Sequence, residues 1–302
     1  MATKFRGIYI PLITVFHDDG EVDYQATEEV IEFMINAGVH GFFVLGSTGM
    51  GPVMTTQQRI ETAEFVVKRI NRRRPVILHV GAADYQTTMQ LAQHGDKLGV
   101  DAIGIVPPYY FSDHTSWEIF EHYKGVAKAI SSPIFLYDNE KYSGFKFTPE
   151  LAKKLKDEVP SLCGMKASYY PQALLLAYLG AMPKDFSVFS GNTIDLFPAA
   201  PQGLCGAIPP PTAHIPEVII ALWNALEAKK YDEAAALQKK ADDYGRTVVR
   251  LGMRFGRTVH RDAFRLRGLN VKRYPRWPAE ELSAEATATL TAALKATGVT
   301  SR

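Results

Sequence analysis

The sequence predicts a (β/α)8 TIM barrel, a closed ring of eight parallel strands that each lead into a helix. Eight short apolar runs recur along the 302-residue chain, and helical periodicity follows them. The runs lack strict alternation of polar and apolar residues, as expected of strands that are buried on both faces of a parallel sheet. Eight such units favour closure into a barrel over an open, doubly wound sheet.

The expected strands lie at residues 7–11, 41–45, 76–80, 102–106, 134–137, 162–166, 186–190 and 206–208. Two joints have nearly the same sequence, Ala37-Gly-Val-His-Gly41 and Leu98-Gly-Val-Asp-Ala102. Each takes the chain from the end of a helix directly into a strand, which indicates that one strand–helix unit is repeated.

Helix start and stop signals lie between these runs. Asp23 is a candidate N-cap, and Thr55 with Gln58 has the spacing of a capping box. Asp84 can open the next helix, and Gly99 can end it. These signals place helices after the first three strands.

After residue 208 the pattern changes to helices alone, expected at 215–228, 231–251 and 279–296. The first of these completes the barrel. We therefore expect residues 1–228 to form the barrel with its catalytic site and residues 229–302 to form a helical region packed on it. No low-complexity linker separates the two parts, which predicts one compact unit.

The composition excludes several classes of protein. The formal net charge is only +2, which gives no support to nucleic-acid or membrane-surface binding, and no apolar run reaches the length of a membrane span. Two cysteines, Cys163 and Cys205, cannot build a disulfide framework and fit a reducing cytoplasm. The eight histidines are scattered without an H-E-x-x-H motif, so we expect no metal. We expect no organic cofactor either.

In such barrels the active site lies at the carboxyl ends of the strands. Lys166 ends one apolar run, and a lysine there would point into the top of the barrel. Loss of solvent would lower its pKa and favour the neutral amine that attacks a carbonyl. The alternative is a lysine that reaches out to solvent or pairs with a carboxylate, and this one position does not decide between the two.

Tyr137 ends the strand next to the one that carries Lys166, and a phenol there could shuttle protons in Schiff-base chemistry. Taken alone, a tyrosine at a strand end is more often a packing residue. Two histidines are candidates by position, His79 at a strand end and His214 in a proline-bounded loop, but a structural role is the more common one at such positions.

The turn Gly46-Ser-Thr-Gly49 offers exposed N–H groups and two hydroxyls, which suit a carboxylate. Its continuation, Met50-Gly51, gives the spacing G-x-x-G-x-G, and no G-K-[ST] follows. A nucleotide-binding loop is therefore a weak alternative.

Five motifs occur together: Gly46-Ser-Thr-Gly49, Pro108-Tyr-Tyr110, Tyr137, Gly164-Met-Lys166 and Ser190-Gly191. In order and spacing they resemble the dihydrodipicolinate synthase and N-acetylneuraminate lyase family, over nearly the whole chain. The resemblance implies a homotetrameric barrel that condenses a lysine with the keto carbon of pyruvate or a longer 2-keto acid.

The resemblance also implies roles for individual residues. Lys166 would form the Schiff base, Tyr137 would shuttle the proton, and Ser47 with Tyr110 would complete a relay, Tyr110 acting at the pocket of a neighbouring subunit. The substrate-binding residues that we expect are Thr48, Gly49, Ser190, Gly191 and Ile208. Among them, Thr48 would hold the carboxylate together with Ser47, and the Gly191 carbonyl would line the site.

Departures from the family pattern narrow the substrate. Met50 stands where many members have a glutamate, and the Gly51-Pro52 that follows is similar to 2-keto-3-deoxy sugar acid aldolases. Ala167 and Ser168 follow the lysine where a synthase usually has an acidic residue.

Two further departures concern the second substrate. Asp138-Asn-Glu140 replaces the usual Asn-x-Pro, and Tyr142 aligns with the arginine that holds a second carboxylate in dihydrodipicolinate synthases. The acidic pair of N-acetylneuraminate lyases falls near Thr193 and Ile194. We therefore expect neither of these activities, and Lys141 is the one cation expected near a distal carboxylate.

Three hypotheses follow. The first is an aldolase that releases pyruvate from a 2-keto-3-deoxy acid, with an aldehyde as the other product. The second is a dehydratase that uses the same imine to expel water. The third is a non-catalytic relative that only binds a keto acid. The intact lysine, tyrosine and Ser-Thr set favours the two enzymes over the binding protein.

Overall fold

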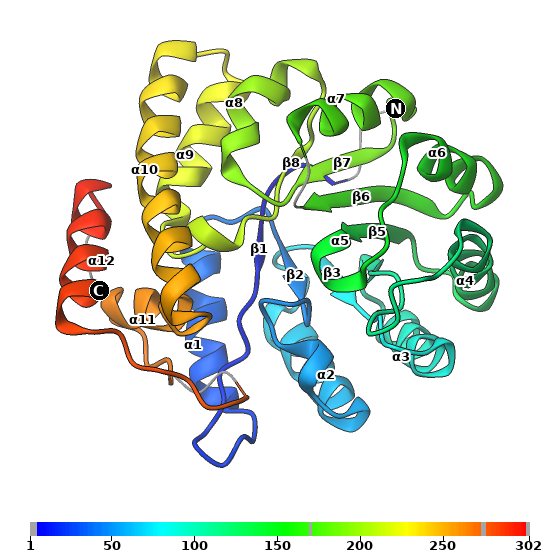
Figure 1. The fold of residues 1–302 in the computed structure, drawn as a ribbon, viewed down its shortest axis with the longest axis horizontal. Coiled ribbons are helices and arrows are strands. Elements are labelled where there is room, and N and C mark those ends of the chain that lie inside the picture. Colours follow the sequence, from blue (N-terminus) through cyan, green and yellow to red (C-terminus); the bar gives the residue numbers. More distant parts are fainter. Residues whose placement is uncertain (1–4, 169–170, 273–275, 300–302) are drawn as a thin grey trace.

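The computed structural model describes residues 5–168, 171–272 and 276–299. Within these ranges, eight parallel strands form a closed barrel in sequence order (Figure 1). This confirms the predicted fold class. The strands are β1 Gly7–Pro11, β2 Gly41–Val44, β3 Val76–His79, β4 Ala102–Ile105, β5 Ile134–Asn139, β6 Leu162–Ser168, β7 Ser187–Ser190 and β8 Gly206–Ala207. Each starts within one residue of its predicted position.

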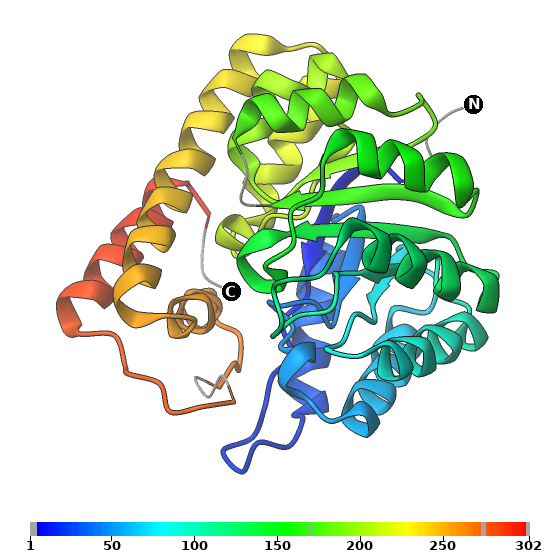
Figure 2. The same cartoon turned by 45° about the vertical axis from the view of Figure 1, so that its right-hand side comes forward.

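Helices surround the barrel on the outside (Figures 1 and 2). Those between the strands are α1 Tyr24–Asn36, α2 Thr56–Ile70, α3 Tyr85–Leu98, α4 Ser116–Ala129, α5 Glu140–Ser143, α6 Pro149–Glu158, α7 Gln172–Ala181 and α8 Leu196–Ala199. The predicted caps are present, since Asp23 and Asp84 accept N–H groups of the first turns of α1 and α3, and Thr55 forms a capping box with Gln58. Gly99 ends α3 in the left-handed conformation.

Strands β5 and β6 run two residues further than predicted, to Asn139 and Ser168. Polar residues extend both strands because each is paired with a neighbour along its full length. The register places Tyr137 directly opposite Lys166. The two residues expected to share the chemistry are therefore neighbours on adjacent strands.

Below Tyr137 and Lys166, the barrel interior is filled by aromatic side chains. Tyr9, Phe135 and Phe189 are buried there and meet edge to face or tilted, with ring centroids 5.2 and 6.0 Å apart. Gly164 makes room for this layer, because a Cβ atom on it would lie 2.5 Å from the Phe135 ring. Lys166, two residues further along β6, stands above a packed core.

The remaining helices are α9 Pro216–Glu227, α10 Tyr231–Phe255, α11 Thr258–Leu266 and α12 Ala284–Ala296. Figures 1 and 2 show α10 along one side of the barrel, packed between α9 and α12. The predicted boundary at 228/229 falls in the turn between α9 and α10, and one hydrophobic cluster continues from the barrel into α10 and α12. Within the described ranges, no helix combines the length and apolar character needed to cross a membrane.

Two details of this region differ from the prediction. Helix α12 begins at Ala284 instead of residue 279, because Ser283 caps it by accepting the N–H of Ala286. Helix α11 was not expected at all. Its sequence is rich in charged residues, yet Arg261 is buried and donates to the carbonyl of Thr14.

Candidate active site

Lys166 lies at the top of the barrel and is only 2% exposed. Its Nζ atom is 4.5 Å from the centroid of the Tyr137 ring and 4.8 Å from that of Phe43. It makes no ion pair with a carboxylate of any described residue. Burial lowers its pKa, and the adjacent Tyr137 only partly offsets this. The lysine therefore neither reaches solvent nor serves as a structural ion-pair partner.

The Tyr137 hydroxyl lies in a small hydrogen-bond network. It is 3.2 Å from the Ser47 hydroxyl and accepts a hydrogen bond of 2.8 Å from Asn139 Nδ2. Burial opposes ionisation of the phenol, but the Lys166 charge and these two hydrogen bonds outweigh it and lower the pKa of Tyr137. The phenol is thus arranged to give up and recover a proton beside the amine.

Asn139 is a site residue that the sequence analysis did not identify. It is 1% exposed, and its Oδ1 atom has no hydrogen-bond partner among the described residues. Side chains two positions apart on a strand share a face, so the extension of β5 to residue 139 places it beside Tyr137. A longer predicted strand would have revealed it.

The turn after β2 supplies Ser47 and Thr48, and both line the same cavity as Lys166. In the described part of the chain, the N–H groups of Thr48 and Gly49 have no hydrogen-bond acceptor. Gly49 itself is not among the residues that line the cavity, and its carbonyl accepts the Thr14 hydroxyl at 2.7 Å. Two amides without an acceptor beside two hydroxyls are the groups with which a turn can hold an anion.

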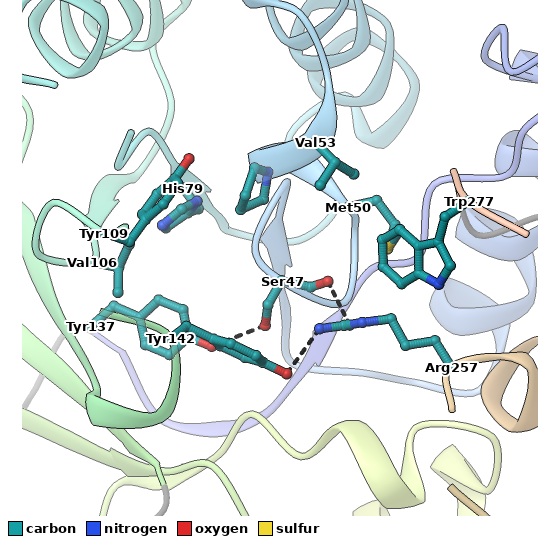
Figure 3. Close-up of a pocket in the computed structure, with 11 residues that line it drawn as sticks. Ser47, Met50, Val53, His79, Val106, Tyr109, Tyr137, Tyr142, Arg257 and Trp277 are labelled. Atoms are coloured by element: carbon teal, nitrogen blue, oxygen red, sulfur yellow. Dashed lines mark hydrogen bonds between the residues drawn. The ribbon is translucent and has the colours of Figure 1, made fainter. Parts of the chain in front are cut away.

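Two adjoining cavities open at the top of the barrel. The one that contains Lys166 has a volume of about 350 Å³, and the other, of about 280 Å³, is lined mainly by apolar groups, among them Val106, Tyr109 and Trp277. Ser47, Tyr137, Tyr142 and Arg257 border both cavities, and Figure 3 shows them in the apolar one. The hydrogen-bonded pair of Ser47 and Tyr137 therefore lies where the two cavities meet.

Arg257 corrects the expectation that Lys141 is the one cation near a distal carboxylate. Its Nη1 donates to the Ser47 carbonyl and its Nη2 to the Tyr142 hydroxyl, both at 2.8 Å. In Figure 3 its guanidinium points toward these two residues. It precedes α11 and lies 115 positions after Tyr142, so no local motif could have brought it to the site.

Three further expected site residues do not line either cavity, namely Ser190, Ile208 and Tyr110. Gly191 lines the cavity of Lys166 as expected. Ser190 does not, because its hydroxyl donates to Asp195 Oδ2 at 2.5 Å. Ile208 is fully buried in the barrel interior, in the same cluster as Tyr137. Tyr110 is 87% exposed and lines neither cavity, so within one chain it is separated from the relay.

The histidines have defined surroundings. His79 is buried, and its Nδ1 lies 3.1 Å from the Leu45 carbonyl, while burial lowers its pKa to about 3. His260 lines the cavity of Lys166, where burial lowers its pKa to about 4, and it stacks on His214. All three are neutral near pH 7, since the pKa of His214 is also lowered by burial. No group of three or more metal-ligating side chains occurs in the described ranges.

Known proteins with similar sequences and structures indicate the family of this chain. The sequence model of the dihydrodipicolinate synthetase family matches residues 4–297. The "Probable 2-dehydro-3-deoxy-D-pentonate aldolase YjhH" of Escherichia coli K12 is 32% identical over 78% of this chain and 79% of its own. The N-acetylneuraminate lyase of Rhizobium meliloti is 28% identical over 83% and 82%.

A solved structure is similar over almost the full length. This is YagE, a prophage protein of the dihydrodipicolinic acid synthase family from E. coli K12, in complex with pyruvate. It superposes with a TM-score of 0.92 and 28% identity, covering 98% of this chain and 99% of its own.

Proposed function

The chain belongs to the dihydrodipicolinate synthetase family and is a Schiff-base class I lyase, and we propose that it cleaves a 2-keto-3-deoxy acid to pyruvate and an aldehyde. The observation that carries this proposal is a desolvated lysine beside a hydrogen-bonded phenol, both lining a cavity at the top of the barrel. The pyruvate bound to YagE and the substrate named for YjhH support the substrate class.

In the first half of the proposed reaction the neutral Lys166 amine attacks the 2-keto carbon. Tyr137 gives its proton to the oxygen that becomes a hydroxyl, and loss of water leaves a protonated imine. The Tyr137 phenolate is stabilised by the hydrogen bonds from Ser47 and Asn139. The hydroxyl and the amide of Thr48 and the Gly191 carbonyl would position the substrate carboxylate and imine.

In the second half the phenolate removes the proton of the C4 hydroxyl. The C3–C4 bond breaks, its electron pair moves into the imine to form an enamine, and the aldehyde leaves. Protonation at C3 and hydrolysis then release pyruvate and restore the Lys166 amine.

We extend the proposal to the assembly. Tyr110 would complete the relay of a neighbouring subunit in a homotetramer, which is consistent with its exposure and with the exposed Phe111 beside it. The two cysteines form no disulfide, which supports a reducing, cytoplasmic location.

Borohydride trapping tests the proposed function. Reduction in the presence of pyruvate should attach a stable adduct to Lys166, which mass spectrometry of the digested protein would locate. Lys166→Ala should lose the adduct and about 10³-fold or more of the turnover. The matched control is Lys141→Ala, which removes the other lysine of the same cavity and should leave the adduct on Lys166. An adduct on any other lysine would contradict the mechanism, and release of water without pyruvate would replace the aldolase by the dehydratase.

A further inference from the structure

We propose that Arg257 binds a carboxylate at the far end of the substrate, so that the natural substrate is a dicarboxylic 2-keto-3-deoxy acid whose leaving aldehyde carries its own acid group. This inference rests on the proposed function, because it concerns the same cavity. It goes beyond the sugar acid named for YjhH, which has one carboxylate.

The first observation is the charge of the cavity. Its lining contains Lys141, Lys166 and Arg257, and no aspartate or glutamate among the described residues. His260 adds no charge at neutral pH. Once Lys166 has become a protonated imine, the 2-keto carboxylate offsets that charge, but Arg257 still has no anionic partner at the site. A second carboxylate would supply it.

The second observation is that Arg257 is held in place before any substrate arrives. The Ser47 carbonyl and the Tyr142 hydroxyl fix both ends of its guanidinium, which also lies 5.6 Å from the centroid of the Tyr142 ring. Of the five N–H donors of an arginine, these two bonds use two. A pre-ordered guanidinium with donors to spare loses little entropy on binding a planar carboxylate.

The third observation is the position of Arg257 relative to the chemistry. Ser47 lies between Tyr137 and Arg257, since its hydroxyl faces Tyr137 and its carbonyl faces Arg257 (Figure 3). A substrate whose reacting carbons lie at Tyr137 would therefore extend past Ser47 toward the guanidinium. This is the end of the substrate that leaves as the aldehyde.

A different role for Arg257 is a brace that only holds Ser47 and Tyr142. The two roles differ in their dependence on substrate charge. A brace affects all substrates equally, whereas a carboxylate-binding residue affects only those with a distal acid group.

The experiment uses a matched pair of six-carbon 2-keto-3-deoxy acids, one ending in a hydroxymethyl group and the other in a carboxylate. The unmodified enzyme should prefer the dicarboxylate by about 10-fold or more in kcat/KM. Arg257→Gln should raise KM for the dicarboxylate by about 10²-fold and change kcat/KM for the other acid by less than about 3-fold. Arg257→Lys should restore part of the loss. Equal losses for both substrates would establish the brace and overturn the proposal.

A second measurement needs no variant and removes any dependence on folding. The unmodified enzyme is trapped with pyruvate and borohydride while a competing keto acid is added, either 2-ketoglutarate or its monocarboxylate counterpart 2-ketovalerate. Each competitor is itself trapped on Lys166, so mass spectrometry compares its adduct with that of pyruvate. The dicarboxylate should halve the pyruvate adduct at about 10-fold lower concentration than the monocarboxylate, and equal effects of the two would contradict the proposal. Absence of any pyruvate adduct would instead refute the proposed function, so the two failures are distinguishable.

Discussion

The catalytic cavity has two regions that are built differently. Its floor, formed by Ser47, Tyr137, Asn139 and Lys166, comes from strand ends and the turn after β2, and three of these side chains are almost fully buried. Its rim, formed by Lys141, Tyr142 and Arg257, comes from the short helix α5 and the residue before α11, and it is more exposed. Rigid strands hold the groups that make and break bonds, while connecting segments hold the groups that can select a substrate.

The largest effect should come from a change in the floor. Tyr137→Phe removes only the hydroxyl and keeps the ring, whose centroid lies 5.3 Å from that of Phe43. Turnover should fall by about 10²-fold or more because the proton relay is lost, while thermal stability changes little. Steady-state rates and a melting curve check this. Turnover close to that of the unmodified enzyme would reduce Tyr137 to a packing residue and break the comparison.

A second prediction concerns the outer side of β5, directly behind the floor. Asp138 is 3% exposed and accepts the Tyr178 hydroxyl at 2.9 Å, and burial raises its pKa to about 7. When the pKa of a carboxyl is higher in the folded than in the unfolded protein, the free energy of unfolding falls as pH rises from about 4 to 7. Above pH 7 this group causes no further loss of stability. The carboxylate therefore destabilises the fold at neutral pH.

Asp138→Asn removes this titration. The variant should gain stability over the unmodified protein progressively between pH 4 and 7, reaching on the order of 4 kcal/mol at pH 8. Denaturant unfolding at several pH values measures it, with the exposed Asp185→Asn as the control. A difference that does not vary with pH would show that Asp138 is not the titrating group. Turnover should stay close to that of the unmodified enzyme, because the Asp138 side chain faces away from the floor.

The smallest effect should come from the rim. Tyr142→Phe keeps the ring beside Arg257 and removes the hydroxyl that accepts its hydrogen bond. KM for a dicarboxylic substrate should rise by about 3-fold because the guanidinium is less well ordered, and kcat should stay unchanged. A fall in kcat instead would place Tyr142 with the floor and remove the distinction between the two regions.

Local patterns in the sequence were sufficient for the barrel and for most of the floor. Each apolar run marks a strand, and the residue at its end has a known position at the top of a parallel barrel. Lys166 and Tyr137 could therefore be predicted as neighbours, whereas the role of Ser47 came from the family resemblance. Asn139 was missed only because polar residues extend β5 beyond its apolar run.

The rest was decided by the tertiary structure. Arg257 approaches Ser47 across 210 positions of sequence, because α10 packs along the barrel and Arg257 lies in the short connection between α10 and α11. Conversely, Ser190 and Ile208 lie in the predicted order along the chain but point to Asp195 and into the core. Strand ends follow from the local periodicity of the chain, whereas the side chains that close over them depend on how distant helices pack, and no pattern in neighbouring residues encodes that packing.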